Sequence, residues 1–212
     1  MTTLRICFVG DSITAGTGDD ECLGWPGRLS SAGRRRGHDI SPYNLGIRGD
    51  TSAMIAPRWR AECEARLPAA HPGALVFAFG INDIAREADG RLRVEPGDSV
   101  AIARRILSEA KPWKPTLMIG PTPILRETLT LSLNPGQPRE LQDARLAATT
   151  QAYAAMCAEI GVPFLDLFTP LSADTRFRAA MAAGDGIHPT AEGYAVMAQF
   201  IDTWPAWRKW FD

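Results

Sequence analysis

The strongest constraint on the fold is an alternation of short apolar runs with segments of helical periodicity. Five runs read as strands: residues 4–9 (LRICFV), 39–45 (DISPYNL), 74–79 (ALVFAF), 116–120 (TLMIG) and 162–167 (VPFLDL). Several are apolar at consecutive positions, as in strands buried on both faces. Because a helix usually returns the chain between parallel strands, the alternation predicts an α/β fold with a five-stranded parallel sheet covered on both faces. Such sheets bind ligands at the carboxyl ends of their strands.

Four segments between these runs carry apolar residues at helical spacing. Their periodic positions are Ile55, Trp59 and Cys63; Ala103, Ile106, Leu107 and Ala110; Ala144, Ala148, Ala152, Met156 and Ile160; and Tyr194, Met197 and Ile201.

Residues that start and stop helices flank the same segments. Asp98 or Ser99 is predicted to cap the second helix, Gly161 to end the third and Thr190 to cap the fourth. Pro57 predicts that the first helix begins late or kinks, because proline lacks the N–H that a helix interior requires.

Composition narrows the class of protein. At 212 residues, 45% hydrophobic and 22% charged, the chain is predicted to form one domain over residues 1–212. The 23 basic and 24 acidic residues leave a net charge of -1, which provides no overall field for attracting nucleic acid or an anionic membrane. The short run at 34–36 (RRR) is expected to be a solvated helix end.

The cysteines and the amino-terminal segment suggest a cytoplasmic protein. Cys7, Cys22, Cys63 and Cys157 lack C-x-x-C or Cys/His ligand spacing, so they are expected to be free thiols. The early apolar run ICFV leads directly into Gly10 and is shorter than a secretory signal core. No segment approaches the roughly 20 apolar residues of a membrane span.

Polar residues follow the predicted strands at several points. They form GDS at 10–12, NLGIRGDTS at 44–52, GIND at 80–83 and, before the last helix, DGIH at 185–188. By itself, Ser12 fits a helix-capping turn as well as a nucleophile. Ester cleavage, however, needs a nucleophile, a base, a carboxylate that orients the base and donors for an oxyanion. Ser12, His188, Asp185 and Asn82 are candidates for these four roles.

Together the four segments resemble the SGNH hydrolases, also called the GDSL-type esterase/lipase family. The resemblance implies a serine carboxylic ester hydrolase with Ser12 as nucleophile, His188 as base and Asp185 as its partner. It also implies an oxyanion hole formed by the Ser12 N–H, the Gly49 N–H and the Asn82 side chain. Gly49 is preferred to Gly46 because GDTS at 49–52 matches the second family block better.

The same resemblance implies a flavodoxin-like, three-layer α/β/α sandwich and a reaction that uses no metal and no cofactor. The chain departs from the family name at Ile13, which stands where the family has leucine and conserves its volume. Arg48, beside Gly49, is expected either to reach solvent or to favour a substrate with a negative or polar leaving group. Asp50 and Asp83 are expected to brace their loops.

Other features have simpler interpretations. His38 and His71 are expected to be structural. The stretch 120–138 is predicted to be one long irregular loop. With apolar Ile124, Leu125, Leu129, Leu131 and Leu133, it either walls an apolar pocket or packs on the core or at a dimer contact. The tail tryptophans at 204, 207 and 210 share one helical face and are expected to pack against the domain.

The natural ester is left open, with short-chain esters, lysophospholipids, acyl thioesters and acetylated sugars all compatible. The apolar stretch favours an aliphatic acyl group, and a carbohydrate O-acetylesterase is the alternative. A different class is a nucleotide- or phosphate-binding flavodoxin-like module, with GDSITAGTGD around an anion. That segment matches neither G-x-x-x-x-G-K-[ST] nor G-x-G-x-x-G, and Asp11, Asp19 and Asp20 would repel a phosphate. The expected partner is a small-molecule ester; the oligomeric state is not predicted.

Overall fold

A five-stranded parallel sheet forms the centre of the protein. The computed structural model describes residues 3–132 and 138–211. The sheet has the strand order β2-β1-β3-β4-β7, and every neighbouring pair is parallel. Its strands are β1 (Leu4–Gly10), β2 (Ile40–Gly46), β3 (Gly73–Ala78), β4 (Thr116–Ile119) and β7 (Phe164–Leu165). The predicted α/β class and five-stranded parallel sheet are confirmed.

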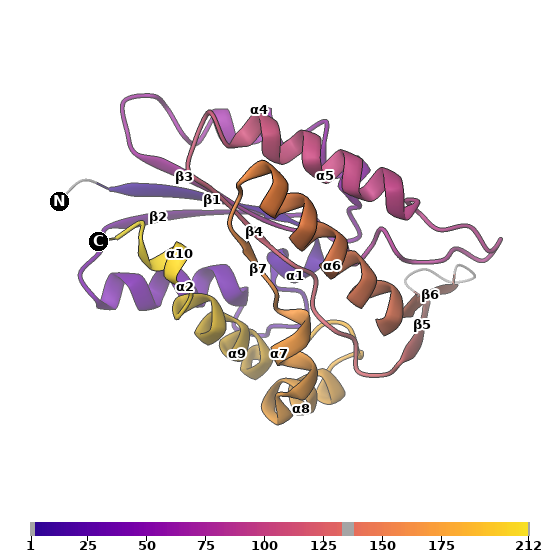
Figure 1. The fold of residues 1–212 in the computed structure, drawn as a ribbon. Coiled ribbons are helices and arrows are strands. Elements are labelled where there is room, and N and C mark those ends of the chain that lie inside the picture. The colour runs from indigo at the N-terminus through magenta and orange to yellow at the C-terminus, as the bar shows by residue number, and fades with distance from the viewer. Residues whose placement is uncertain (1–2, 133–137, 212) are drawn as a thin grey trace.

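Helices cover both faces of the sheet (Figure 1). They are α1 (Ser12–Ala15), α2 (Gly24–Arg35), α3 (Ser52–Ile55), α4 (Trp59–Glu64), α5 (Pro96–Ala110), α6 (Asp143–Ile160), α7 (Phe168–Ala173), α8 (Thr175–Ala183), α9 (Ala191–Asp202) and α10 (Pro205–Arg208). Helices α4, α5 and α6 lie on one face, and α2, α9 and α10 lie on the other. This arrangement is the expected three-layer sandwich.

The core divides into two clusters because alternate residues of a strand point to opposite faces. On β1, Ile6 and Phe8 join the cluster that includes Trp25 of α2 and Tyr194 of α9. The intervening Cys7 and Val9 join the opposite cluster, with Trp59 and Cys63 of α4 and Tyr153 of α6. Burial on both faces accounts for the consecutive apolar residues of this strand.

The strand ends bring polar segments together. Gly10, at the end of β1, pairs in register with Gly46 of β2 and with Ala78 of β3. A Cβ at Gly10 would lie 2.2 Å from the Ala78 carbonyl oxygen and 2.2 Å from Thr14 Oγ1. Glycine therefore allows the chain to turn tightly into α1 at this edge.

The stretch 120–138 is more ordered than the sequence predicts. Part of it forms β5 (Thr128–Ser132), which pairs antiparallel with β6 (Pro138–Gln142) in a separate two-stranded sheet. The interpretation as one irregular loop is therefore wrong. Ile124 is in the core, and Leu125, Leu129 and Leu131 pack against it. Leu133 lies outside the described residues.

Helix boundaries agree with the sequence signals in part. Gly161 ends α6 in the left-handed conformation, with φ of 65°, and the first predicted helix is interrupted around Pro57 into α3 and α4. Thr190 occupies the N-cap position of α9, but its side chain makes no capping hydrogen bond. The predicted cap at Asp98 or Ser99 is wrong, because α5 begins earlier, at Pro96.

The remaining expectations concern the thiols and the tail. All four cysteines are free, and Cys22 is the exposed one among them. Trp207 is buried in the core, with Trp204 and Trp210 packed against it, as predicted for the tail. Over residues 3–132 and 138–211, no helix combines the length and apolar character needed to traverse a bilayer.

Candidate active site

Ser12 is the first residue of α1, directly after β1 and Asp11. Asp11, not Ser12, caps this helix, because its Oδ1 accepts the Ile13 N–H at 3.0 Å. The Ser12 hydroxyl is consequently not used in capping, although only 5% of the residue is exposed. Its Oγ lies 2.8 Å from Nε2 of His188.

His188 is held by the turn that precedes α9. Asp185 Oδ1 accepts the backbone N–H groups of Ile187 and His188, at 2.9 and 2.8 Å. These two bonds orient the carboxylate so that its other oxygen lies 2.7 Å from Nδ1 of the His188 ring. Ser12, His188 and Asp185 thus form one hydrogen-bonded chain across residues that are far apart in sequence.

The charge of Asp185 determines the direction of these hydrogen bonds. Partial burial alone would raise the pKa of this carboxyl, but the His188 ring and the two N–H donors outweigh it and hold the pKa below its usual range. An ionised carboxylate can only accept, so Nδ1 of the neutral imidazole carries the proton. Nε2 then presents a lone pair to the Ser12 hydroxyl.

The second and third polar segments supply donors beside Ser12. Gly49 has φ of 80°, a left-handed conformation that favours glycine, and it lies in the turn between β2 and α3. Its N–H has no acceptor within the described part of the chain. Asn82, after β3, donates from Nδ2 to the Asp50 carbonyl at 3.0 Å, which leaves its other amide hydrogen available.

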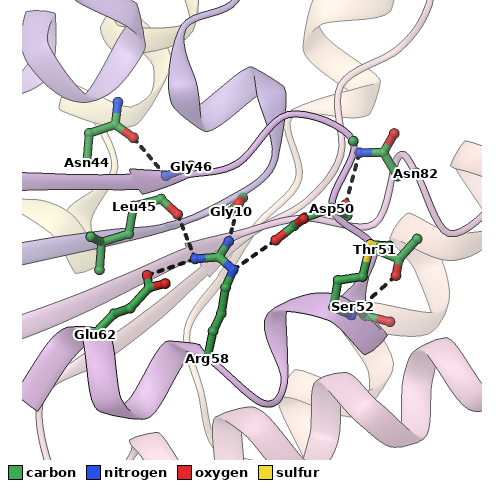
Figure 2. Close-up of polar contacts among 12 residues, drawn as sticks. Gly10, Asn44, Leu45, Gly46, Asp50, Thr51, Ser52, Arg58, Glu62 and Asn82 are labelled. Atoms are coloured by element: carbon green, nitrogen blue, oxygen red, sulfur yellow. Dashed lines mark hydrogen bonds and ion pairs between the residues drawn. The ribbon is translucent and has the colours of Figure 1, made fainter. Parts of the chain in front are cut away.

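A single arginine holds the strand ends and the Gly49 turn together. Figure 2 shows Arg58, the N-cap residue of α4, reaching two carbonyl oxygens and the carboxylates of Asp50 and Glu62. Its guanidinium donates to the carbonyls of Gly10 and Leu45, each at 3.0 Å, and to Asp50 Oδ2 at 2.8 Å. It also pairs with Glu62 at 2.9 Å. Arg58 therefore fixes Asp50, whose carbonyl in turn receives the Asn82 amide.

A second, buried network supports the same turn from the other side. Asp83 Oδ1 accepts the Ser52 N–H at 2.7 Å, and Oδ2 accepts the Ser99 hydroxyl at 2.6 Å. Ser99 Oγ lies 2.7 Å from the hydroxyl of Tyr153 on α6. Ser99 thus links Asp83 to Tyr153 of α6 and does not cap α5. Asp50 and Asp83 have the bracing contacts expected of them.

A cavity of about 290 Å³ opens over these groups. Ser12, Gly49, Asn82 and His188 all line it. Its remaining lining residues are Arg48, Ile81, Ala85, Leu131, Arg139, Leu141 and Ile187. The cavity is therefore a pocket with apolar walls in which the predicted nucleophile, base and donors meet.

The sequence did not identify every residue of the site. Arg58 and Arg139 sit in stretches that resemble ordinary helix and loop, and no local signal marks either one. Leu141 could be found only from the β5–β6 pairing, which brings it opposite Leu129. His38 stacks on Phe211 near the chain end, outside the site. Among residues 3–132 and 138–211, no group of three or more His, Cys, Asp and Glu side chains could hold a metal.

The contacts of Asp11 argue against the alternative that residues 10–19 form a phosphate-binding turn. Its own carboxylate accepts the Ile13 N–H at the start of α1, which is the position a bound phosphate would take. Asp19 is engaged as well, because it pairs with Arg28 and accepts the Gly24 N–H at 2.7 Å. The segment is thus built around its own carboxylates and does not form an anion cradle.

Comparisons with known proteins show the family of the chain and its fold. The model of the GDSL-like Lipase/Acylhydrolase family matches residues 8–196, which include all four polar segments. No curated protein sequence matches significantly.

Solved structures share the fold at low sequence identity. The lipase/acylhydrolase from Enterococcus faecalis is 20% identical, with a TM-score of 0.71, and covers 95% of this chain and 94% of its own. Axe2, an acetylxylan esterase from Geobacillus stearothermophilus, is 19% identical, with a TM-score of 0.68 and 95% coverage of each chain. A GDSL-like lipase from Bacteroides thetaiotaomicron is 20% identical, with a TM-score of 0.66, and covers 97% of this chain and 88% of its own.

The Arg58 contacts lead to a stability prediction. Arg58→Ala leaves the Asp50 carboxylate without its arginine and removes one hydrogen bond each from the Gly10 and Leu45 carbonyls, so we expect the free energy of unfolding to fall by about 3 kcal/mol. Arg60→Ala is the matched control, because Arg60 lies on the same helix but pairs with exposed Glu64 and stacks on Trp113. It should cost about 1 kcal/mol or less. Chemical denaturation measures both, and equal losses would contradict the assignment.

Asp11 leads to a prediction about pH. Burial raises the pKa of its carboxyl to about 7, against a reference of 3.8 in the unfolded chain. A folded pKa above the unfolded one stabilises the protein at low pH, and this contribution is lost as pH rises toward 7. Asp11→Asn keeps an acceptor for Ile13 and cannot ionise.

We therefore expect wild type to lose about 3 kcal/mol relative to Asp11→Asn between pH 4.5 and 7.5. Denaturant unfolding at several pH values measures the difference. Asp20→Asn, at an exposed carboxyl, removes the same charge and should follow the wild-type profile. Parallel profiles for wild type and Asp11→Asn would contradict the prediction.

Proposed function

Because the chain belongs to the GDSL-like lipase/acylhydrolase family, we propose that it hydrolyses carboxylic esters through an acyl-serine intermediate on Ser12. The observation that carries the proposal is the chain of hydrogen bonds from Ser12 Oγ through His188 to Asp185, at 2.8 and 2.7 Å. A serine hydroxyl is a weak nucleophile unless a base takes its proton, and this chain supplies that base.

In the first step, Ser12 Oγ attacks the ester carbonyl carbon as its proton passes to His188 Nε2. Asp185 holds Nδ1–H and stabilises the imidazolium that forms, because its lowered pKa keeps it ionised. The carbonyl π electrons move to oxygen and leave a tetrahedral oxyanion. Three donors are available to this oxyanion: the Ser12 N–H, the Gly49 N–H and the Asn82 amide.

In the second step, the tetrahedral intermediate collapses and the bond to the alcohol breaks. His188 returns its proton to the departing alkoxide, so the alcohol leaves neutral and the acyl group stays on Ser12. A water molecule then attacks the acyl carbon, with His188 again taking the proton. The second collapse breaks the bond between the acyl carbon and Ser12 Oγ, which takes the proton back from His188, and the carboxylic acid is released.

The cavity favours a small ester. Its volume of about 290 Å³ lies at the lower end of the range for small-molecule sites, about 300 to 1,000 Å³. The apolar walls, which include Ile81, Leu131 and Leu141, suit a short aliphatic acyl group better than a long lipid chain. An acetylated sugar is the second candidate, because an acetyl group also fits this volume and Axe2 shares the fold.

A panel of esters tests the proposal. Wild type should hydrolyse p-nitrophenyl esters with an optimum at short chains, and Ser12→Ala should lose about 10⁴-fold or more of kcat. Ser172→Ala, whose hydroxyl bonds only within its own helix, serves as the control and should retain activity. An acetylated xylo-oligosaccharide in the same panel separates the two candidates. Undiminished turnover in Ser12→Ala would overturn the mechanism.

Asn82 provides a separate prediction. Asn82→Ala should lower kcat by about 10² to 10³-fold with a smaller change in KM, since an oxyanion donor acts mainly in the transition state. Asn44→Ala is the matched control, because the Asn44 amide also bonds the backbone, at Thr14 and Gly46, but does not line the cavity. A kcat near that of wild type would reassign Asn82 to structure.

A further inference from the structure

The charges around the cavity are all of one sign. Within the described residues, two arginines, Arg48 and Arg139, line the cavity, and no acidic side chain does. The protein as a whole carries a net charge of -1, so this concentration of cations is local. A cavity with apolar walls and charges of one sign attracts ligands of the opposite sign, because the low-dielectric walls focus the field.

Arg48 is the more available of the two cations. It is exposed and lies directly before Gly49, the proposed oxyanion donor. Within residues 3–132 and 138–211, its guanidinium has no carboxylate or carbonyl partner. Neighbouring arginines differ, since Arg58 and Arg93 donate to the backbone and to acids. Arg48 therefore lines the cavity without taking part in the bracing contacts.

Arg139, on β6, adds positive charge to the lining of the same cavity. It pairs with Glu87 at 3.1 Å, but Glu87 is shared, because Arg93 approaches the same carboxylate at 3.4 Å. One carboxylate thus balances two guanidiniums. Burial and the charge of Arg139 both lower the pKa of Arg93, although the charges of Glu87, Asp83 and Asp50 oppose them. Glu87 alone therefore does not neutralise both Arg93 and Arg139.

The walls between the two arginines are apolar, with Ile81, Ala85, Leu131 and Leu141 among the lining residues. A ligand that satisfies both features has a short apolar segment next to the ester and an anionic group at the end that reaches solvent. We propose that the natural substrate is an ester carrying an anionic group, a carboxylate or a phosphate, which Arg48 binds and Arg139 helps to attract. This inference rests on the proposed ester hydrolysis and specifies its substrate class.

Matched pairs of esters test the charge preference. In the first pair the anion is in the acyl half: p-nitrophenyl hemiadipate and its neutral methyl ester. In the second it is in the alcohol half: m-acetoxybenzoate and its methyl ester. For at least one pair, wild type should show a kcat/KM about 10-fold higher for the anionic member, mainly through KM, and added salt should reduce this ratio.

The variants assign the preference to Arg48. Arg48→Gln should bring the anionic-to-neutral ratio of kcat/KM close to one. Arg35→Gln removes the same charge from the exposed surface of α2, where Arg35 bonds Ser31, and should keep the wild-type ratio. Equal kcat/KM for both members of both pairs in wild type would overturn the inference, as would a ratio in Arg48→Gln equal to that of Arg35→Gln.

The experiment also separates this inference from the proposed function. Turnover of the neutral esters that depends on Ser12, without any charge preference, would leave ester hydrolysis standing and overturn the anionic substrate. Absence of Ser12-dependent turnover on all four esters would overturn both.

Discussion

The carboxyl edge of the sheet depends on the Arg58 guanidinium. The Gly10 and Leu45 carbonyls lie where β1 and β2 stop, and the Gly10 carbonyl already accepts the Ile47 N–H at 3.1 Å. Arg58 adds a hydrogen bond to each carbonyl and pairs with Asp50, so one side chain joins the two strand ends to the following turn. The Asn82 amide then bonds the Asp50 carbonyl. The relative position of the donors near Ser12 thus follows from how the sheet ends.

The second network that holds the site contains the buried carboxyl of Asp83. Burial of this group costs free energy, and its hydrogen bonds offset that cost. Burial raises the pKa of Asp83, while hydrogen bonds from Ser52 and Ser99 counteract that effect. A buried carboxyl is tolerated only when its oxygens are bonded, and here the donors come from two helices, with Tyr153 extending the network to a third. Such a network is rigid because loss of any member leaves a buried polar group unpaired. Asp83, the residue after Asn82, is thereby fixed by donors from α3 and α5.

The sequence predicts the fold better than it predicts the supports of the site. Periodicity and composition act locally, so the five strands and helices α3 to α6 and α9 could be predicted from residues a few positions apart, whereas α7 and α8 were not predicted. The polar segments could also be placed, because strand ends of a parallel sheet meet at one edge. Arg58 could not, since its partner Gly10 is 48 residues away and its own surroundings look like an ordinary helix.

Ser99 was misread for the same reason, because a serine near a helix start fits a cap until a distant Asp83 is known. The pairing of β5 with β6 escaped notice although TLTLS at 128–132 alternates, because its partner PRELQ at 138–142 begins with proline and shows no such alternation.

Because Ser12 is the first residue of α1, the same short turn provides both the proposed nucleophile and a free backbone N–H. The first N–H groups of a helix have no acceptor within it. Asp11 takes the Ile13 N–H, and the Ser12 N–H has no acceptor in the described part of the chain. Gly49 is similar, because its left-handed turn leaves its N–H unpaired. Two of the three donors that the proposed reaction requires are therefore backbone N–H groups, those of Ser12 and Gly49, that the fold leaves without an acceptor in the described part of the chain. Asn82 is the one side chain among the proposed donors. One of its amide hydrogens bonds the carbonyl of Asp50, a residue that Arg58 positions, and this bond orients the other hydrogen, which is the proposed donor.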